Sequence, residues 1–151
     1  NRINETIQVI KEDNIQDNII FTGIIDRNEM PTYLGNAELL VVSKPNNEQN
    51  SGNFPNKIGE YLATGVPIVT TKVGEIPYFI KDGYNGFLAE PDSVDSFYQK
   101  MKEALNSPQK NIIGKRGQET ALNEFDYRKL ANIVINEIEK INKHHELTHR
   151  R

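Results

Sequence analysis

Residues 39–43, Leu-Leu-Val-Val-Ser, constrain the fold more than any other stretch because four consecutive apolar side chains before Ser43 leave no polar face. A strand that is apolar on both faces has to be covered on both faces, as in a parallel sheet between two layers of helices. Two more short strand patterns follow at 67–71 and 87–89, each after a segment with helical periodicity. Strands that alternate with helices indicate a mostly parallel α/β sheet with right-handed crossovers.

The remaining patterns predict where the other elements lie. Apolar residues at helical spacing predict helices over 3–13, 30–37, 55–64, 94–105 and 127–143, and a weaker pattern predicts one over 108–124. Residues 75–80 are expected to form a short helix despite Pro77, and a β-branched run closed by glycine predicts a strand over 18–23. We therefore expect a Rossmann-like domain over 1–106, helices of the same domain over 107–143, and a polar, frayed tail over 144–151. Because the chain starts on a helix, and helices in such folds normally follow a strand, we expect the opening strand of the sheet to lie upstream.

Composition excludes several classes of function. The 151 residues carry a net charge of −3 and no cysteine, so the chain offers no basic surface for nucleic acid, no disulfide scaffold and no cysteine-ligated zinc site. The lack of cysteine fits a reducing cytoplasm. No apolar run approaches the roughly 20 residues that cross a bilayer, so we expect no transmembrane segment. The histidines, His144, His145 and His149, all lie in the polar tail, where a solvated surface is a plainer interpretation than a metal site.

One connection between elements predicts a ligand site. In open parallel sheets, ligands bind beyond the carboxyl ends of the strands, where helices begin. The connection after residues 39–43 is long and polar, and connections of this length are more often functional than short ones. It ends at Gly52 and Asn53, which allow a tight bend, and at Pro55, which suits the first position of a helix. The free N–H groups of that first turn favour an anion, and phosphate is the obvious candidate.

Two charged residues on the predicted helix 55–64 allow two interpretations. A cation at Lys57, in the first turn, opposes the helix dipole at a cost of roughly 0.3–1 kcal/mol at an exposed site. In the first interpretation, Glu60 neutralises Lys57 as an i, i+3 ion pair, which contributes only a few tenths of a kcal/mol. In the second, Lys57 binds a ligand phosphate while Glu60 accepts hydrogen bonds from vicinal hydroxyls, such as those of a ribose. Composition and spacing alone favour the ion pair.

A longer pattern covers the same residues. The stretch "GNFPNKIGEYLATGVPIVTTKVGEIPYFIKDGYNGFLAEPDS" (52–93) and the upstream stretch "NIIFTGIIDRNEMPTYLGNAELLVVSKP" (18–45) resemble the nucleotide-sugar-binding half of retaining glycosyltransferases of family 4. The resemblance covers residues 1–105 closely and implies the GT-B fold, which has two Rossmann-like domains. By this resemblance the chain is most of the C-terminal, donor-binding domain without its opening βα segments.

The resemblance implies a set of substrate-binding residues. Glu60 would bind the ribose hydroxyls of the donor, and the backbone of Ile24 and Ile25 would flank the nucleobase. The donor sugar and diphosphate would lie at the start of the helix, against Gly52, Asn53, Phe54, Pro55 and Lys57. The family usually has a second glutamate eight positions before Glu60, where this chain has Gly52. This departure indicates a subgroup of the family, with Glu48 as a weaker candidate to replace the missing carboxylate.

The resemblance also implies the chemistry. The enzyme would transfer a sugar from a nucleotide-sugar to a glycan or lipid-linked acceptor with retention, using no cofactor, typically no metal and no protein nucleophile. Fixed amides and cations would stabilise the charge on the leaving diphosphate. The acceptor would bind mainly to the missing N-terminal domain, so we do not expect this chain to catalyse transfer alone. The family places the reaction in the cytoplasm, in many members at the inner face of the membrane.

Two other classes of function stay open from the sequence. A non-catalytic interaction module would keep the fold without binding nucleotides, and the glycine at position 52 is the feature that favours it. A sugar-nucleotide epimerase shares the fold, but it would need catalytic carboxylates and histidines in the cleft between its domains. No histidine precedes position 144 in this chain, which argues against the epimerase.

Overall fold

The chain forms two compact units in the computed structural model, which describes residues 2–52 and 56–148. The first unit ends at Met30 and the second begins at Pro31. The first contains helix α1 (Arg2–Glu12) and a short 3-10 turn, η1 (Gln16–Asn18). The predicted helix over 3–13 is confirmed by α1, in which Ile10 is buried.

The predicted strand over 18–23 is wrong. Residue 18 closes η1, and residues 19–23 form no β-ladder with any described part of the chain. Ile20 and Phe21, two of the residues that suggested a strand, are 86% and 58% exposed. A strand exists only when its N–H and C=O groups pair with a neighbouring strand. Side-chain type predicted the strand, but no described segment pairs with it.

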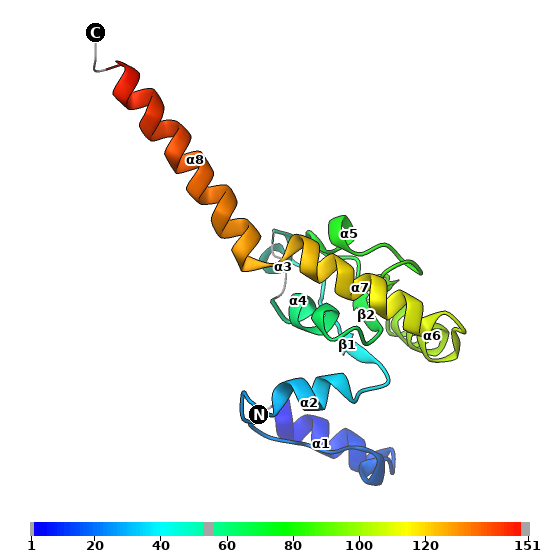
Figure 1. Ribbon diagram of the computed structural model, residues 1–151. Helices are drawn as coiled ribbons and strands as arrows, with labels where there is room; N and C mark the ends of the chain where they lie inside the picture. The colour runs from blue at the N-terminus through cyan, green and yellow to red at the C-terminus, as the bar shows by residue number, and fades with distance from the viewer. Residues whose placement is uncertain (1, 53–55, 149–151) are drawn as a thin grey trace. The chain divides into compact units, whose positions relative to one another are not determined.

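The second unit is built on a three-stranded parallel sheet (Figure 1). The strands lie in the order β1 (Leu40–Val42), β2 (Ile68–Thr71) and β3 (Phe87–Ala89), with Val42 opposite Thr70 and Thr70 opposite Leu88. The helices of this unit are α2 (Met30–Gly35, which begins on the last residue of the first unit), α3 (Glu48–Ser51), α4 (Asn56–Ala63), α5 (Ile76–Phe79), α6 (Val94–Asn106), α7 (Lys110–Glu124) and α8 (Tyr127–Thr148). The predicted α/β class and the parallel sheet flanked by helices are confirmed.

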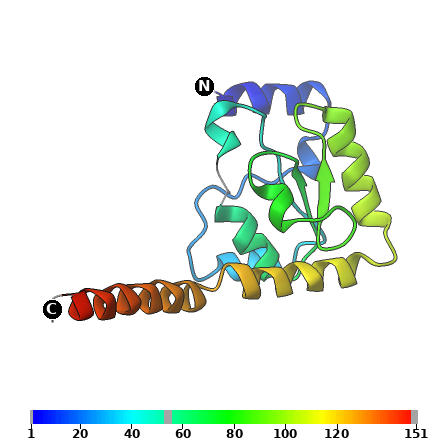
Figure 2. The ribbon, with the colours of Figure 1, turned by 90° about the horizontal axis from the view of Figure 1, so that it is seen from above.

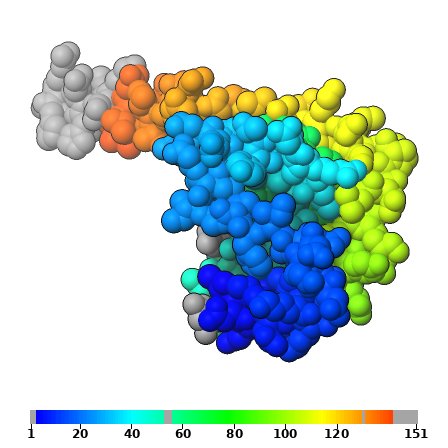
Figure 3. Space-filling model, turned by 90° about the horizontal axis from the view of Figure 1, so that it is seen from below, coloured from blue at the N-terminus to red at the C-terminus, as the bar shows by residue number. Residues whose placement is uncertain are grey.

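Helices cover both faces of this sheet. Alternate residues of β2 point to opposite faces, so Ile68 packs with Ile58 and Leu62 of α4, while Val69 packs with Ala104 of α6. Figure 2 shows the strands between α4 and α6, and Figure 3 shows α6 and α7 side by side on the surface of this unit. The β2 strand is buried on both faces. The prediction that the continuous apolar run 39–43 is covered on both faces is wrong for β1, in which Leu40 is buried but Val41 is 42% exposed, because α6 packs against β2 and β3.

Two parts of the helical C-terminal region differ from expectation. Helix α8 continues to Thr148, so residues 144–148, which we expected to be frayed, are helical. The apolar stripe of α8 does not enter a core in the described structure: Val134, Ile138 and Ile141 are 57%, 52% and 63% exposed. Helical periodicity correctly predicts the helix, but periodicity alone does not identify what the apolar face packs against.

The two threonines that end β2 lie in opposite environments. Thr70 is on the α4 face and 1% exposed, and its Oγ1 has no hydrogen-bond partner in the described structure. Thr71 is on the α6 face and 2% exposed, and its hydroxyl binds the backbone of Lys44 twice. It accepts a hydrogen bond from the Lys44 N–H at 3.0 Å and donates one to the Lys44 carbonyl at 2.8 Å. A buried hydroxyl without a partner destabilises the fold, whereas a paired one does not.

We therefore expect Thr70→Val to raise the free energy of unfolding by about 1 kcal/mol, since valine keeps the shape and removes an unpaired buried hydroxyl. Thr71→Val is the matched control, and it should lower the free energy of unfolding by about 1–3 kcal/mol because the Lys44 backbone loses its partner. Urea unfolding followed by circular dichroism measures both variants. Equal losses of stability in the two variants would mean that the Thr70 hydroxyl has a partner in solution.

Candidate functional site

The predicted site begins in the connection between β1 and α4. This connection is not wholly irregular, since it contains the one-turn helix α3. The Asn47 side chain caps α3 by accepting a hydrogen bond from the Asn50 N–H at 3.0 Å, and the Asn50 side chain donates to the Pro45 carbonyl at 2.9 Å. Gly52 follows as the exposed C-cap residue of α3. Asn53, Phe54 and Pro55 lie outside the described residues, so their expected contacts with the donor stay predictions.

The two charged residues of α4 are both exposed and do not pair with each other. No ion pair joins Lys57 to Glu60 in the described structure, although the same i, i+3 spacing does form ion pairs at Lys100–Glu103 and Glu137–Lys140. The interpretation that spacing alone favours, a neutralising Lys57–Glu60 pair, is therefore wrong for this structure. A cation in the first turn of a helix and a carboxylate one turn later are both left available to a ligand.

Lys57 borders a hollow between α4 and the end of β1. This hollow has a volume of ≈ 570 Å³, and its walls are the end of β1 and the residues that follow it on one side and α4 on the other. Its polar lining residues are Ser43, Lys44, Asn56, Lys57 and Tyr61. Two lysines and no carboxylate line it, so its charge favours an anion. The hollow lies at the carboxyl end of a parallel strand, where open α/β sheets bind ligands.

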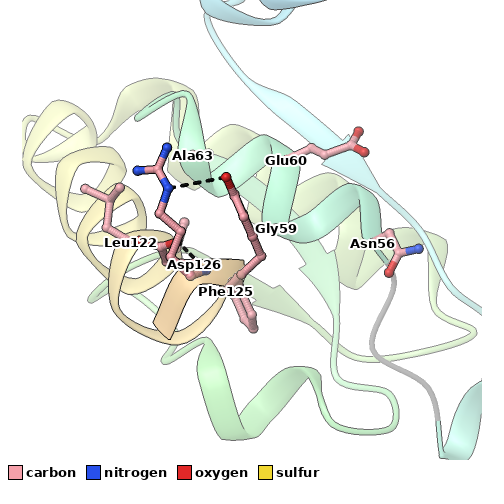
Figure 4. A pocket seen from close by; sticks show the side chains of 10 residues that line it. Asn56, Gly59, Glu60, Ala63, Leu122, Phe125 and Asp126 are labelled. Carbon is pink, nitrogen blue, oxygen red and sulfur yellow. Dashed lines mark hydrogen bonds between the residues drawn. The ribbon is translucent and has the colours of Figure 1, made fainter. Parts of the chain in front are cut away.

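Glu60 borders a second hollow, on the opposite flank of α4. This hollow has a volume of ≈ 530 Å³ and lies between α4 and the junction of α7 with α8. Gly59 and Phe125 form part of its wall, and Asn56 borders both hollows. Figure 4 shows the Glu60 side chain pointing away from Phe125 and Asp126, on the same side of α4 as Asn56. The carboxylate is therefore open to solvent and to a ligand rather than engaged with the wall.

Sequence reasoning missed two basic residues of these hollows. Lys44 borders the hollow of Lys57, and Arg128, at the start of α8, borders the hollow of Glu60. The signal for Lys44 was present, because it is the first charged residue after the apolar run 39–43 and so had to lie at the carboxyl end of that strand. Arg128 gave no such signal, since it lies 68 positions after Glu60 and only the fold of α7 brings it near α4.

The remaining predicted contact is with the nucleobase. Ile24 is fully exposed and Ile25 is half-buried, and both belong to the first unit, so their predicted place beside a nucleobase stays a prediction. Among the side chains that the structure describes, no three or more histidine or acidic groups lie together as a metal ion would require. No helix in this part of the chain is both long and apolar enough to cross a membrane.

Comparison with known proteins identifies the family. The family model described as "Glycosyl transferases group 1" matches residues 2–107, which is most of the chain. The chain belongs to this family. Over 122 residues it is 26% identical to the sulfoquinovosyl transferase of Arabidopsis thaliana, an alignment that covers 78% of this group 1 chain and 23% of the plant protein.

Solved structures agree on the fold of this group 1 glycosyltransferase chain. Sucrose-phosphate synthase from Thermosynechococcus elongatus superposes with a TM-score of 0.77 and 21% identity, over 93% of this chain and 34% of that one. HepE from Anabaena, solved in complex with UDP-glucose, superposes with a TM-score of 0.79 and 21% identity, over 91% of this chain and 36% of that one. The architecture is that of GT-B glycosyltransferases. The chain spans between about a quarter and about a third of these proteins.

Proposed function

We propose that this chain is the donor-binding domain of a retaining glycosyltransferase of family 4, and that it binds the nucleotide-sugar at the start of α4. The observation that carries the proposal is the pair of unpaired charges on α4, Lys57 and Glu60, at the carboxyl edge of a parallel sheet. Membership of the group 1 glycosyltransferases supports it. So does the fold shared with a protein solved in complex with UDP-glucose.

The proposed donor contacts follow the two flanks of α4. Glu60 accepts hydrogen bonds from the vicinal hydroxyls of the ribose, and Lys57 binds the diphosphate. Gly52 and the backbone of Asn53, Phe54 and Pro55 hold the donor sugar and the diphosphate, and the backbone of Ile24 and Ile25 flanks the nucleobase. Fixed cations and amides then stabilise the charge that develops on the leaving diphosphate, which needs neither a protein nucleophile nor a metal.

The acceptor side of the reaction lies outside this chain in the proposal. A GT-B enzyme has a second Rossmann-like domain, and we assign the glycan or lipid-linked acceptor to that domain. The chain's coverage of its relatives leaves room for a region of that size. Transfer to the acceptor would then take place on the cytoplasmic side of the membrane and would need both domains.

Amide chemical-shift mapping with nucleoside diphosphates tests the donor site. We expect UDP, GDP or ADP to shift the backbone amides of Gly52, Asn56 and Lys57 more than those of any other segment, because the anion lies at the start of α4. A non-catalytic interaction module, the alternative function, would show no binding to any member of the panel. Shifts concentrated in residues 144–151 instead would contradict the assignment of the site.

A further inference from the structure

Lys44 stands beside the proposed donor site and is not explained by the fold. It is the second lysine of the hollow between β1 and α4, and the residues that line this hollow include no carboxylate. Its side chain makes no ion pair and no hydrogen bond in the described part of the chain. The residue is half-buried, and its ammonium group has no anionic partner in the described structure.

The backbone of Lys44 is held by a buried side chain. The Thr71 hydroxyl, from the neighbouring strand, both accepts from the Lys44 N–H and donates to the Lys44 carbonyl, at 3.0 Å and 2.8 Å. Thr71 is 2% exposed, so water does not compete for these bonds. Connections after strands are usually more mobile than the strands themselves, and this one is fixed at the residue that carries the charge. A backbone that is fixed before binding leaves only the Lys44 side chain to be ordered by the ligand, which lowers the entropic cost.

The acidic residues that share a hollow with Lys44 are engaged elsewhere. Lys44 also borders a hollow on the α6 side, where Glu90 and Asp92 are lining residues. Glu90 forms an ion pair with Lys72, and Asp92 accepts a hydrogen bond from the Asn46 N–H at 3.3 Å. Neither carboxylate pairs with Lys44 in the described structure. The cation therefore remains available on the side where Lys57 provides a second one.

We propose that Lys44 binds the diphosphate of the donor together with Lys57, and that Thr71 is the residue that positions Lys44. The inference rests on the proposed function, since it takes the anion to be the diphosphate of a nucleotide-sugar. Two lysines on opposite walls of one hollow match a group that carries two adjacent anionic phosphates better than a single carboxylate or monophosphate. Lys44 and Thr71 would therefore determine the preference for a diphosphate over a monophosphate.

Calorimetric titration of the full chain with UDP, UMP and uridine tests the inference. Lys44→Met should weaken UDP binding about tenfold or more, as the loss of a charge-assisted contact does, and should leave uridine binding unchanged. Thr71→Val should lower the preference for UDP over UMP, as Lys44→Met does. Thr71→Ser should keep the preference of the wild type, because serine keeps the hydroxyl. If Thr71 acts through Lys44, the double variant should lose no more preference than Lys44→Met alone. Lys115→Met, which removes an exposed lysine on α7, is the matched control.

Each outcome separates the inference from the proposed function. UDP binding that is equal in Lys44→Met and wild type overturns the role of Lys44 and leaves the donor site intact. A Thr71→Val variant that loses stability but keeps the UDP preference leaves Thr71 with a purely structural role and overturns the positioning claim. If wild type binds no nucleotide but binds inorganic pyrophosphate through Lys44, the anion site stands and the proposed function fails. If it binds neither, both fail.

Discussion

Gly114→Ala is expected to destabilise the protein by more than about 3 kcal/mol, although alanine is the better helix former. Gly114 lies in α7, where a Cβ would come within 2.1 Å of the Gly65 carbonyl oxygen and 3.1 Å of the Pro67 nitrogen. These are backbone atoms of the connection into β2, and no side-chain rotation removes the overlap. Helix propensity alone predicts the opposite sign, a gain of roughly 1 kcal/mol. A loss of stability in Gly114→Ala would therefore support the close packing of α7 against this connection, and a gain would contradict it.

Two other glycines provide a graded control for this prediction. A Cβ at Gly59, within α4, would meet only Phe125 at 3.7 Å, so Gly59→Ala should be neutral or stabilise by up to about 1 kcal/mol. A Cβ at Gly117 would lie 2.9 Å from both the Asn85 carbonyl oxygen and the end of the Leu62 side chain, so an intermediate loss of about 1–3 kcal/mol is expected. Urea unfolding with fitted m-values measures all three. A Gly114→Ala protein as stable as wild type would contradict the close packing.

Gly114 and Gly117 also explain why the sequence predicts α7 only weakly. A helix is normally recognised by large apolar residues at i, i+3 and i+4, but the buried positions of α7 include Gly114, Gly117 and Ala121. Small residues at i, i+3 and i+7 let the helix approach α4 and the β2 entrance closely, so they form a packing face without an apolar stripe. A hydrophobicity pattern does not detect this face, because its residues are glycine and alanine. It is identified by the short distances from a Cβ at Gly114 to Gly65 and from a Cβ at Gly117 to Asn85.

The sheet shows the reverse case, in which strong local patterns do not guarantee a strand. The strands at 40–42, 68–71 and 87–89 were predictable because each is apolar and each has a neighbour in the second unit. Residues 19–21 are as apolar as these, yet they have no pairing partner among the described residues and stay irregular. Strand propensity depends on the residues of one segment, whereas a β-ladder needs two segments that pair. The sequence pattern of one segment therefore predicts its propensity but not whether it has a partner.

The candidate site was predictable where topology fixes it and not where side chains decide it. The carboxyl end of β1 and the start of α4 follow from the order of the elements, so Lys57 and Glu60 could be placed from the sequence. Whether these two charges pair depends on side-chain conformation, and the spacing predicted a pair that the structure does not contain. Arg128 was out of reach for the same reason, because a contact between α4 and the α7–α8 junction depends on long-range packing.

Glu60→Gln is expected to weaken the binding of a nucleoside diphosphate by about 10- to 150-fold. Each hydrogen bond from a ribose hydroxyl to the carboxylate is charge-assisted, and the loss of the pair costs roughly 1.5–3 kcal/mol. Glutamine has nearly the same shape and keeps some hydrogen-bonding capacity, so the substitution tests the charge with little effect on packing. Glu60 is exposed and makes no ion pair with Lys57, so the stability of the fold should change by less than about 0.5 kcal/mol.

The ribose itself provides the sharpest readout for Glu60. Calorimetric titration with a nucleoside diphosphate and its 2′,3′-dideoxy form should show that wild type prefers the ribose form, because only that form offers vicinal hydroxyls to the carboxylate. Glu60→Gln should lose most of this preference, while Glu119→Gln, which removes an exposed carboxylate on α7, should retain it. Lys44→Met should also retain it, since that substitution acts on the phosphates and not on the sugar. A ribose preference that is unchanged in Glu60→Gln would mean that Glu60 does not contact the ribose, and the donor would then have to lie elsewhere along α4.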